Sequence, residues 1–110
     1  MKVDMIFLQH MLERCEKVRK ITASTTKEEF CYDPDKQDLV VHSLEIIGEA
    51  TTHLSQEFKE KYADIPWVEI KDLRNVLTHQ YFRIDPEEVW EISQTDVEEL
   101  YSFLRNICGT

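Results

Sequence analysis

Residues 33–54 read D-P-D-K-Q-D-L-V-V-H-S-L-E-I-I-G-E-A-T-T-H-L, and this stretch predicts a long helix. Asp33 is a favoured residue just before a helix, and Pro34 fits the first helical position, where its missing N–H costs nothing. We expect the helix to run to about Leu54. Apolar residues cover most of its circumference: Leu39, Val40, Val41, Leu44, Ile46, Ile47, Ala50 and Leu54. A helix this apolar is expected at the centre of a helical bundle.

One polar column interrupts this helix, formed by Asp38, His42, Glu45 and Glu49. Ionised carboxylates inside a bundle are costly unless they are paired, so we expect Arg74 from a neighbouring helix to contact Glu45 or Glu49. The alternative is a divalent metal ion held by the histidine and the two glutamates. Helical columns of this kind are more often salt-bridged, so we assign no metal site.

The remaining segments also predict helices. The first long helix places Val3, Phe7, Met11, Cys15 and Val18 on one apolar face. Further helix starts are predicted by capping patterns at Thr26-x-x-Glu29, Ser55, Asp85-Pro86 and Thr95-x-x-Glu98, and by the proline at Pro66. The helix from Pro66 is expected to end near Gln80. The last helix carries the apolar series Val97, Leu100, Tyr101, Leu104, Ile107 and Cys108. With no repeat or linker, residues 1–110 are predicted to form one all-α domain, an antiparallel helical bundle.

Composition narrows the possible functions. The 110 residues contain only 2 Gly and 3 Pro, too few for the turns of an all-β protein. The three cysteines have no C-x-x-C spacing, so we expect neither a disulfide framework nor a zinc site, and a reducing cytoplasm fits best. We expect no membrane span and no signal peptide. The net charge of −9 opposes bulk binding of nucleic acid, so any RNA chemistry must use a local basic cluster.

Such a cluster lies between residues 71 and 83, and its members are Lys71, Arg74, Asn75, Thr78, His79, Gln80, Tyr81 and Arg83. A histidine can move protons near neutral pH, a guanidinium can hold a phosphate, and an amide can orient either group. Arg74 also falls in an apolar column with Trp67 and Tyr81, where its stem could simply pack while its head reaches water or a carboxylate. Arg74 and His79 lie about 140° apart around a helix, so they converge only at a helix end or with help from a second copy.

The string R-N-x-x-x-H-x-Y at residues 74–81 resembles the signature of HepT-like toxins, a branch of the HEPN superfamily. The similarity continues in L-E-I-I-G-E-A at 44–50, I-P-W at 65–67, Y-F-x-I-D at 81–85 and V-W at 89–90. Thr78 stands where the family usually has an aliphatic residue. The resemblance spans residues from about Asp38 to Leu100.

This resemblance implies a HEPN bundle that forms a homodimer and acts as a metal-independent endoribonuclease, without a cofactor, in a type VII toxin–antitoxin system. It implies that His79 is the general acid or base, that Arg74 stabilises charge on the phosphate and that Asn75 orients one of them. The implied partners are an RNA substrate and an antitoxin similar to the MntA minimal nucleotidyltransferases, which adenylylates Tyr81; neither DNA nor a membrane is expected.

Two other functions remain open. Some small HEPN proteins resemble noncatalytic subunits that bind nucleotide or substrate for a partner nucleotidyltransferase. A helical dimerisation module without chemistry is the third possibility, but it leaves Arg74 in an apolar column unexplained. The acidic residues of the last third of the chain are interpreted as a solvated face or as a docking surface for the antitoxin: Asp85, Glu87, Glu88, Glu91, Asp96, Glu98 and Glu99.

Overall fold

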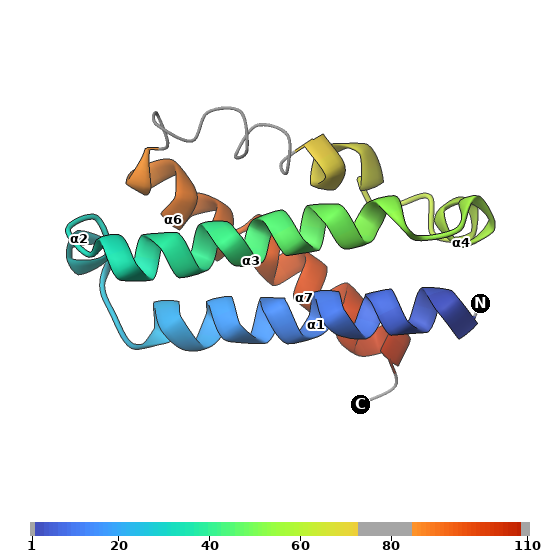
Figure 1. Cartoon of the computed structure of the whole chain (residues 1–110), viewed down its shortest axis with the longest axis horizontal. Helices are drawn as coiled ribbons and strands as arrows, with labels where there is room; N and C mark the ends of the chain where they lie inside the picture. The colour runs from blue at the N-terminus through green and yellow to red at the C-terminus, as the bar shows by residue number, and fades with distance from the viewer. Residues whose placement is uncertain (1, 73–84, 109–110) are drawn as a thin grey trace.

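The computed structural model describes residues 2–72 and 85–108, and over these residues the chain is helical with no strand (Figure 1). The helices with defined bounds are α1 (Lys2–Ala23), α2 (Lys27–Phe30), α3 (Pro34–Thr52), α4 (Gln56–Lys61), α6 (Pro86–Gln94) and α7 (Asp96–Cys108). Residues 67–72 are helical as well. The predicted all-α class is confirmed. No helix in the described ranges has an apolar stretch long enough to cross a membrane.

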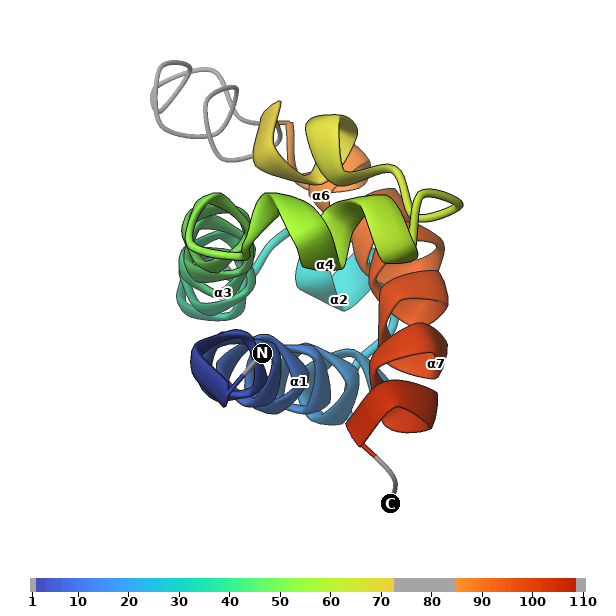
Figure 2. The same ribbon diagram turned by 90° about the vertical axis from the view of Figure 1, so that its right-hand side faces the viewer.

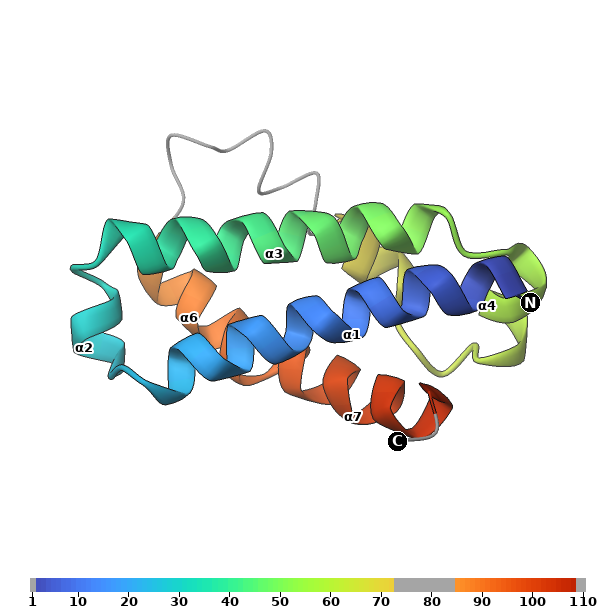
Figure 3. The ribbon, with the colours of Figure 1, turned by 60° about the horizontal axis from the view of Figure 1, so that its bottom comes forward.

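The core lies where α1 packs against α3 on one side and α7 on the other (Figures 2 and 3). α1 and α3 run in opposite directions, as expected for an antiparallel bundle (Figure 1). From α1, Met11, Cys15 and Val18 are fully buried, as their spacing predicted. The partners that cover them on the two neighbouring helices include Val40, Leu44 and Ile47 of α3 and Val97, Leu100 and Leu104 of α7.

Four of the predicted helix starts are capped as expected, those of α2, α3, α4 and α6. At α2, the Thr26 hydroxyl accepts a hydrogen bond from the Glu29 N–H at 3.1 Å, and the Glu29 carboxylate accepts one from the Thr26 N–H at 3.0 Å. At α3, Asp33 accepts a backbone N–H at 3.2 Å and is followed by Pro34 in the first turn. At α6, Asp85 does the same at 3.0 Å. These caps satisfy backbone donors that have no partner inside the helix.

The capping box predicted at Thr95 and Glu98 is wrong. Thr95 has helical backbone angles and ends α6, with its hydroxyl donating to the Glu91 carbonyl at 2.8 Å. An N-cap residue needs an extended backbone, and the immediate start of α7 at Asp96 leaves no room for one. The Glu98 carboxylate instead accepts hydrogen bonds from Arg19 on α1.

The first turn of α1 also differs from the prediction. Val3 and Ile6 are more than half exposed, whereas Asp4 is only 3% exposed. The Asp4 carboxylate accepts hydrogen bonds from the N–H and the hydroxyl of Ser55, both at 2.7 Å. Ser55 in turn caps α4 by accepting the Phe58 N–H at 3.1 Å. The polar residue is inside because it joins the start of α1 to the start of α4.

Candidate functional site

The motif residues Arg74, Asn75, His79 and Tyr81 lie outside the residues that the structure describes. Their predicted roles, and their convergence in one cleft, therefore stay predictions. The structure does describe the two segments that precede and follow the motif in the chain, namely the helical residues 67–72 and α6 (Figure 1).

The segment before the motif is attached to the core through Trp67. Its side chain is only 7% exposed, and its indole N–H donates to the Tyr62 carbonyl at 3.0 Å. The ring also packs against Phe58 and Phe103, with centroid separations of 5.8 and 5.7 Å. A buried aromatic side chain with a satisfied polar atom is a strong anchor, so the start of the helix that leads toward Arg74 is held in place.

The segment after the motif is attached equally well. Asp85 caps α6 and Pro86 occupies its first turn. Val89 is 1% exposed, and the ring of Trp90 packs against Phe30 of α2 with a centroid separation of 5.4 Å. Both ends of the motif segment therefore join elements that pack into the same core.

The polar column on α3 lies on its outer face, so the expectation of buried carboxylates is wrong. Asp38, His42 and Glu49 are exposed and Glu45 is half-buried. The core face of α3 is formed by other residues, and one side of the helix is left to solvent. Ionised carboxylates on such a face stay hydrated, so their charge alone does not require a buried partner.

Within the described residues, Glu49 contacts a histidine that the sequence analysis did not pair with it. Its carboxylate oxygen lies 3.5 Å from the Nε2 of His53, one helical turn further on, and the His53 ring stacks on Phe7 at 4.8 Å. The predicted pairing of Arg74 with Glu45 or Glu49 lies outside the described residues. In the described ranges, no group of three or more His, Cys, Asp or Glu residues is placed to hold a metal ion.

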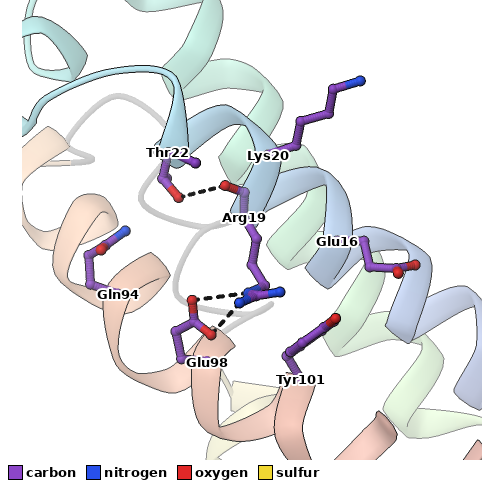
Figure 4. Close-up of a pocket in the computed structure, with 8 residues that line it drawn as sticks. Glu16, Arg19, Lys20, Thr22, Gln94, Glu98 and Tyr101 are labelled. Atoms are coloured by element: carbon purple, nitrogen blue, oxygen red, sulfur yellow. Dashed lines mark hydrogen bonds and ion pairs between the residues drawn. The ribbon is translucent and has the colours of Figure 1, made fainter. Parts of the chain in front are cut away.

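Sequence reasoning missed a polar cluster between α1 and α7. The Nε of Arg19 lies 3.0 and 3.1 Å from the two carboxylate oxygens of Glu98, and its guanidinium carbon lies 4.0 Å from the ring centre of Tyr101 (Figure 4). The hydrogen bond with Glu98 raises the pKa of Arg19 above its usual value. The cluster lines a surface pocket of about 460 Å³. In the sequence, Glu98 indicated only a helix cap with Thr95, and no pattern linked it to Arg19.

The cysteines do not form a reactive site. Cys15 is buried, and this burial, with a smaller contribution from Glu98, raises the pKa of its thiol to about 12. Burial also raises the pKa of Cys108. Because the thiolate is the nucleophilic form, neither thiol is activated, in agreement with their interpretation as small core residues.

The chain is thus helical over the described residues, and its R-x-x-x-x-H motif lies in the sequence between two segments that are anchored in the core. The model of the family described as ribonuclease HepT-like matches residues 11–107, so the chain belongs to this family. The resemblance found in the sequence is thereby confirmed at the level of the family.

Several relatives of known name support the same family assignment. The protein named "Putative RNase TTE0752" of Caldanaerobacter subterraneus subsp. tengcongensis is 36% identical over 107 residues, which cover 97% of this chain and 96% of the relative. "Probable ribonuclease HepT" of Thermococcus cleftensis is 33% identical over 94 residues, 86% of each chain. "Gamma-glutamylcyclotransferase and putative RNase MJ0434" of Methanocaldococcus jannaschii is 39% identical over 95 residues, which cover 86% of this chain but 43% of that longer protein. No solved structure matches the chain.

Proposed function

We propose that this chain is a metal-independent endoribonuclease and the toxin of a type VII toxin–antitoxin pair, silenced by adenylylation of Tyr81. The observation that carries the proposal is the string R-N-x-x-x-H-x-Y at residues 74–81 in a chain of the ribonuclease HepT-like family. The antitoxin would be a minimal nucleotidyltransferase similar to MntA. RNA cleavage as the activity is supported by two relatives that are named as a putative RNase and a probable ribonuclease.

The three motif side chains suit phosphodiester cleavage. His79 would take the proton of a ribose 2′-hydroxyl, whose oxygen attacks the adjacent phosphorus. The bond from phosphorus to the 5′-oxygen then breaks, that oxygen takes up a proton, and the products are a 2′,3′-cyclic phosphate and a 5′-hydroxyl. Arg74 would stabilise the added charge of the five-coordinate phosphate, and Asn75 would orient His79 or the phosphate.

The cleft would be shared by two copies of the chain. Arg74 and His79 are five residues apart, about 140° around a helix, so one helix does not point both at the same phosphate. A homodimer that pairs the helix following Pro66 with its symmetry mate would bring Arg74 of one copy to His79 of the other. Both helices that flank the motif are fixed to the core, which supports a defined geometry at such an interface.

A mixing experiment tests the shared cleft. Arg74→Ala and His79→Ala homodimers should each be inactive, but a mixture that exchanges subunits should recover about a quarter of wild-type activity, because half the dimers then hold one intact cleft of two. Light scattering should give a dimer. Complete inactivity of the mixture despite exchange would place both groups in one chain, and a fully active monomer would contradict the dimer.

Adenylylation would inhibit the same cleft. AMP on Tyr81 adds a phosphodiester anion and a bulky nucleoside two residues from His79. The anion would compete for Arg74 and repel the RNA backbone, and the nucleoside would block access. Co-expression with the nucleotidyltransferase should add one or more AMP units to the Tyr81 peptide by mass spectrometry, and none to Tyr81→Phe. An unmodified Tyr81 in a neutralised protein would instead indicate steric inhibition.

The decisive test of the activity itself is cleavage of a labelled RNA in EDTA. Wild-type protein should produce a 2′,3′-cyclic phosphate, and His79→Ala should lose about two to four decades of rate. Activity that is lost in EDTA and restored by manganese would contradict the metal-independent mechanism. Absence of cleavage by the unmodified wild type would favour the noncatalytic subunit.

We further propose that Glu45 or Glu49 positions Arg74. Glu49 lies on the outer face of α3, where a guanidinium from another segment can approach it from solvent. Glu49→Gln should reduce the cleavage rate, whereas Glu16→Gln on the exposed side of α1 should not. If Glu49→Gln and Glu16→Gln both leave the cleavage rate unchanged, the polar column of α3 is simply solvated and does not position Arg74.

A further inference from the structure

RNA binding by this chain requires cations that are free to contact phosphates, because the net charge of −9 repels the RNA backbone. Three surface pockets in the described part of the chain differ sharply in this respect. The pocket beside Arg19 contains a guanidinium, but Glu98 already occupies it with two hydrogen bonds and Tyr101 covers one face (Figure 4). A phosphate there would have to displace a carboxylate.

A second pocket, of about 500 Å³, is lined by acidic residues and by no basic ones. Its rim carries the four carboxylates of Asp64, Glu69, Asp96 and Glu99, and it contains no Lys, Arg or His. Like charges brought close together repel, so this pocket disfavours an RNA strand. It borders the segment that leads to the motif on one side.

A third pocket, of about 530 Å³, borders the same segment and carries two lysines, whereas the pocket beside Arg19 carries one, Lys20, together with Glu16 and Glu98. Lys59 comes from α4 and Lys71 from the helical residues 67–72, and both side chains line this pocket. Neither lysine forms an ion pair within the described ranges. Lys59 is half-buried, so its stem is held by packing, and Lys71 is exposed.

The rest of this pocket suits a nucleotide chain. Val68, which is 67% exposed, and Pro66 provide an apolar surface that a ribose or base can cover. Glu60 also lines the pocket and opposes the charge of the lysines, and its carboxylate accepts a hydrogen bond from the Gln56 amide at 3.3 Å. Glu69 is the acidic group that this pocket shares with the carboxylate-rimmed one.

We propose that the pocket lined by Lys59 and Lys71 is a binding site for the sugar–phosphate backbone of RNA, and that it guides the strand to the motif. Lys71 precedes Arg74 by only three residues in the chain. A strand held at Lys71 is therefore close to the motif along the chain, whereas the carboxylate-rimmed pocket, which borders the same segment, disfavours an RNA strand. This inference rests on the proposed ribonuclease function, since it assigns that function its substrate contacts outside the motif.

The test is binding of a fluorescent single-stranded 2′-O-methyl RNA to the wild-type chain, measured by anisotropy at several salt concentrations. The 2′-O-methyl groups remove the attacking hydroxyl, so binding is measured without cleavage. Each phosphate contact contributes about 0.7 to the slope of log affinity against log salt for single strands. Lys59→Ala and Lys71→Ala should therefore each lower the slope by about 0.7 and the affinity at 0.1 M salt by about fivefold.

Matched controls separate this site from general charge effects. Lys17→Ala removes an exposed charge of the same sign from α1, and it should change the affinity much less. Glu69→Gln should tighten binding, whereas Glu57→Gln, on α4 but outside the pocket, should not. Circular dichroism should show that each variant is folded.

The outcomes distinguish this inference from the proposed function. If wild type binds and cleaves RNA but the two lysine variants behave like Lys17→Ala, the lysine pocket is not the binding site while the ribonuclease function stands. If wild type binds no RNA at all, both are wrong.

Discussion

Replacing Asp4 should destabilise the chain more than any surface substitution. The residue lies in the first turn of α1, where a sequence reading would treat an aspartate as a solvated favourable charge. In the structure its carboxylate is almost completely buried and accepts two hydrogen bonds of 2.7 Å from Ser55, across 51 residues of sequence. Asp4→Ala removes both bonds, and it leaves the Ser55 N–H without its acceptor.

The size of the effect follows from these contacts. Hydrogen bonds to a charged group contribute about 1.5–3 kcal/mol each, so losing two destabilises the fold by about 3–6 kcal/mol. Ser55→Ala loses one of the two bonds and the cap of α4, and it should cost about 2–5 kcal/mol. Domains of this size are stable by only about 5–15 kcal/mol, so Asp4→Ala should leave a protein that unfolds at a much lower temperature.

Urea unfolding followed by circular dichroism measures these values for both variants and for the double variant. Because the two side chains act on each other, the double variant should cost clearly less than the sum of the single ones. Glu13→Ala, an exposed position on the same helix, is the control and should cost less than about 0.5 kcal/mol. A cost below about 1 kcal/mol for Asp4→Ala would refute the argument that this carboxylate joins the two helices.

The remaining predictions concern three other residues, Arg19, Cys15 and Ser43. Arg19→Gln should cost only about 0.5 kcal/mol in urea unfolding, because the side chains of Arg19 and Glu98 are each more than 40% exposed and water screens the pair; a cost of several kcal/mol would contradict this. The Cys15 thiol, with its pKa raised to about 12 against a usual 9, should resist a disulfide reagent at pH 8 in the native protein, while Cys31 reacts. Because the unfolded thiol ionises first, the free energy of unfolding should fall as pH rises above 9, and a rise would contradict the assignment. Ser43→Ala should leave stability unchanged or raise it by up to about 1 kcal/mol, since the Ser43 hydroxyl is buried without a hydrogen-bond partner in the described structure.

Helix starts could be predicted from the sequence because their causes are local. Asp33-Pro34 and Thr26-x-x-Glu29 each place donor and acceptor within four residues of one another, so the pattern already contains the whole interaction. The apolar spacing of α7 was equally informative, since three of its predicted residues are buried.

Interactions between distant segments could not be predicted in this way. Asp4 is buried only because Ser55 lies beside it, and nothing in the first turn of α1 indicates that partner. Thr95 matched a capping pattern, yet α7 follows α6 immediately, and the Thr95 hydroxyl donates to the Glu91 carbonyl instead of accepting a backbone N–H. The polar column of α3 was assigned to the interior because the helix is rich in apolar residues, although one outward face is enough to hydrate it.

The candidate site shows the same division. The motif letters at 74–81 and the family they indicate could be read directly, and the family is confirmed. The proposed approach of Arg74 to His79 would depend on contacts beyond a single helix, which spacing alone does not encode. The lysine pocket, too, brings together α4 and a later segment, and no pattern within either one predicts it.

The packing of α1 between α3 and α7 affects how the protein folds during its synthesis on the ribosome. A total of 73 positions separate the end of α1 at Ala23 from the start of α7 at Asp96. At synthesis rates of about 5–20 residues per second, α7 follows α1 by about 4–15 s. During that interval α3 can cover only one side of α1, and the side that belongs to α7 stays open to water or to a chaperone. The nascent chain therefore lacks the α7 side of its core until α7 has been made, so a chain terminated before α7 should be recognised and degraded.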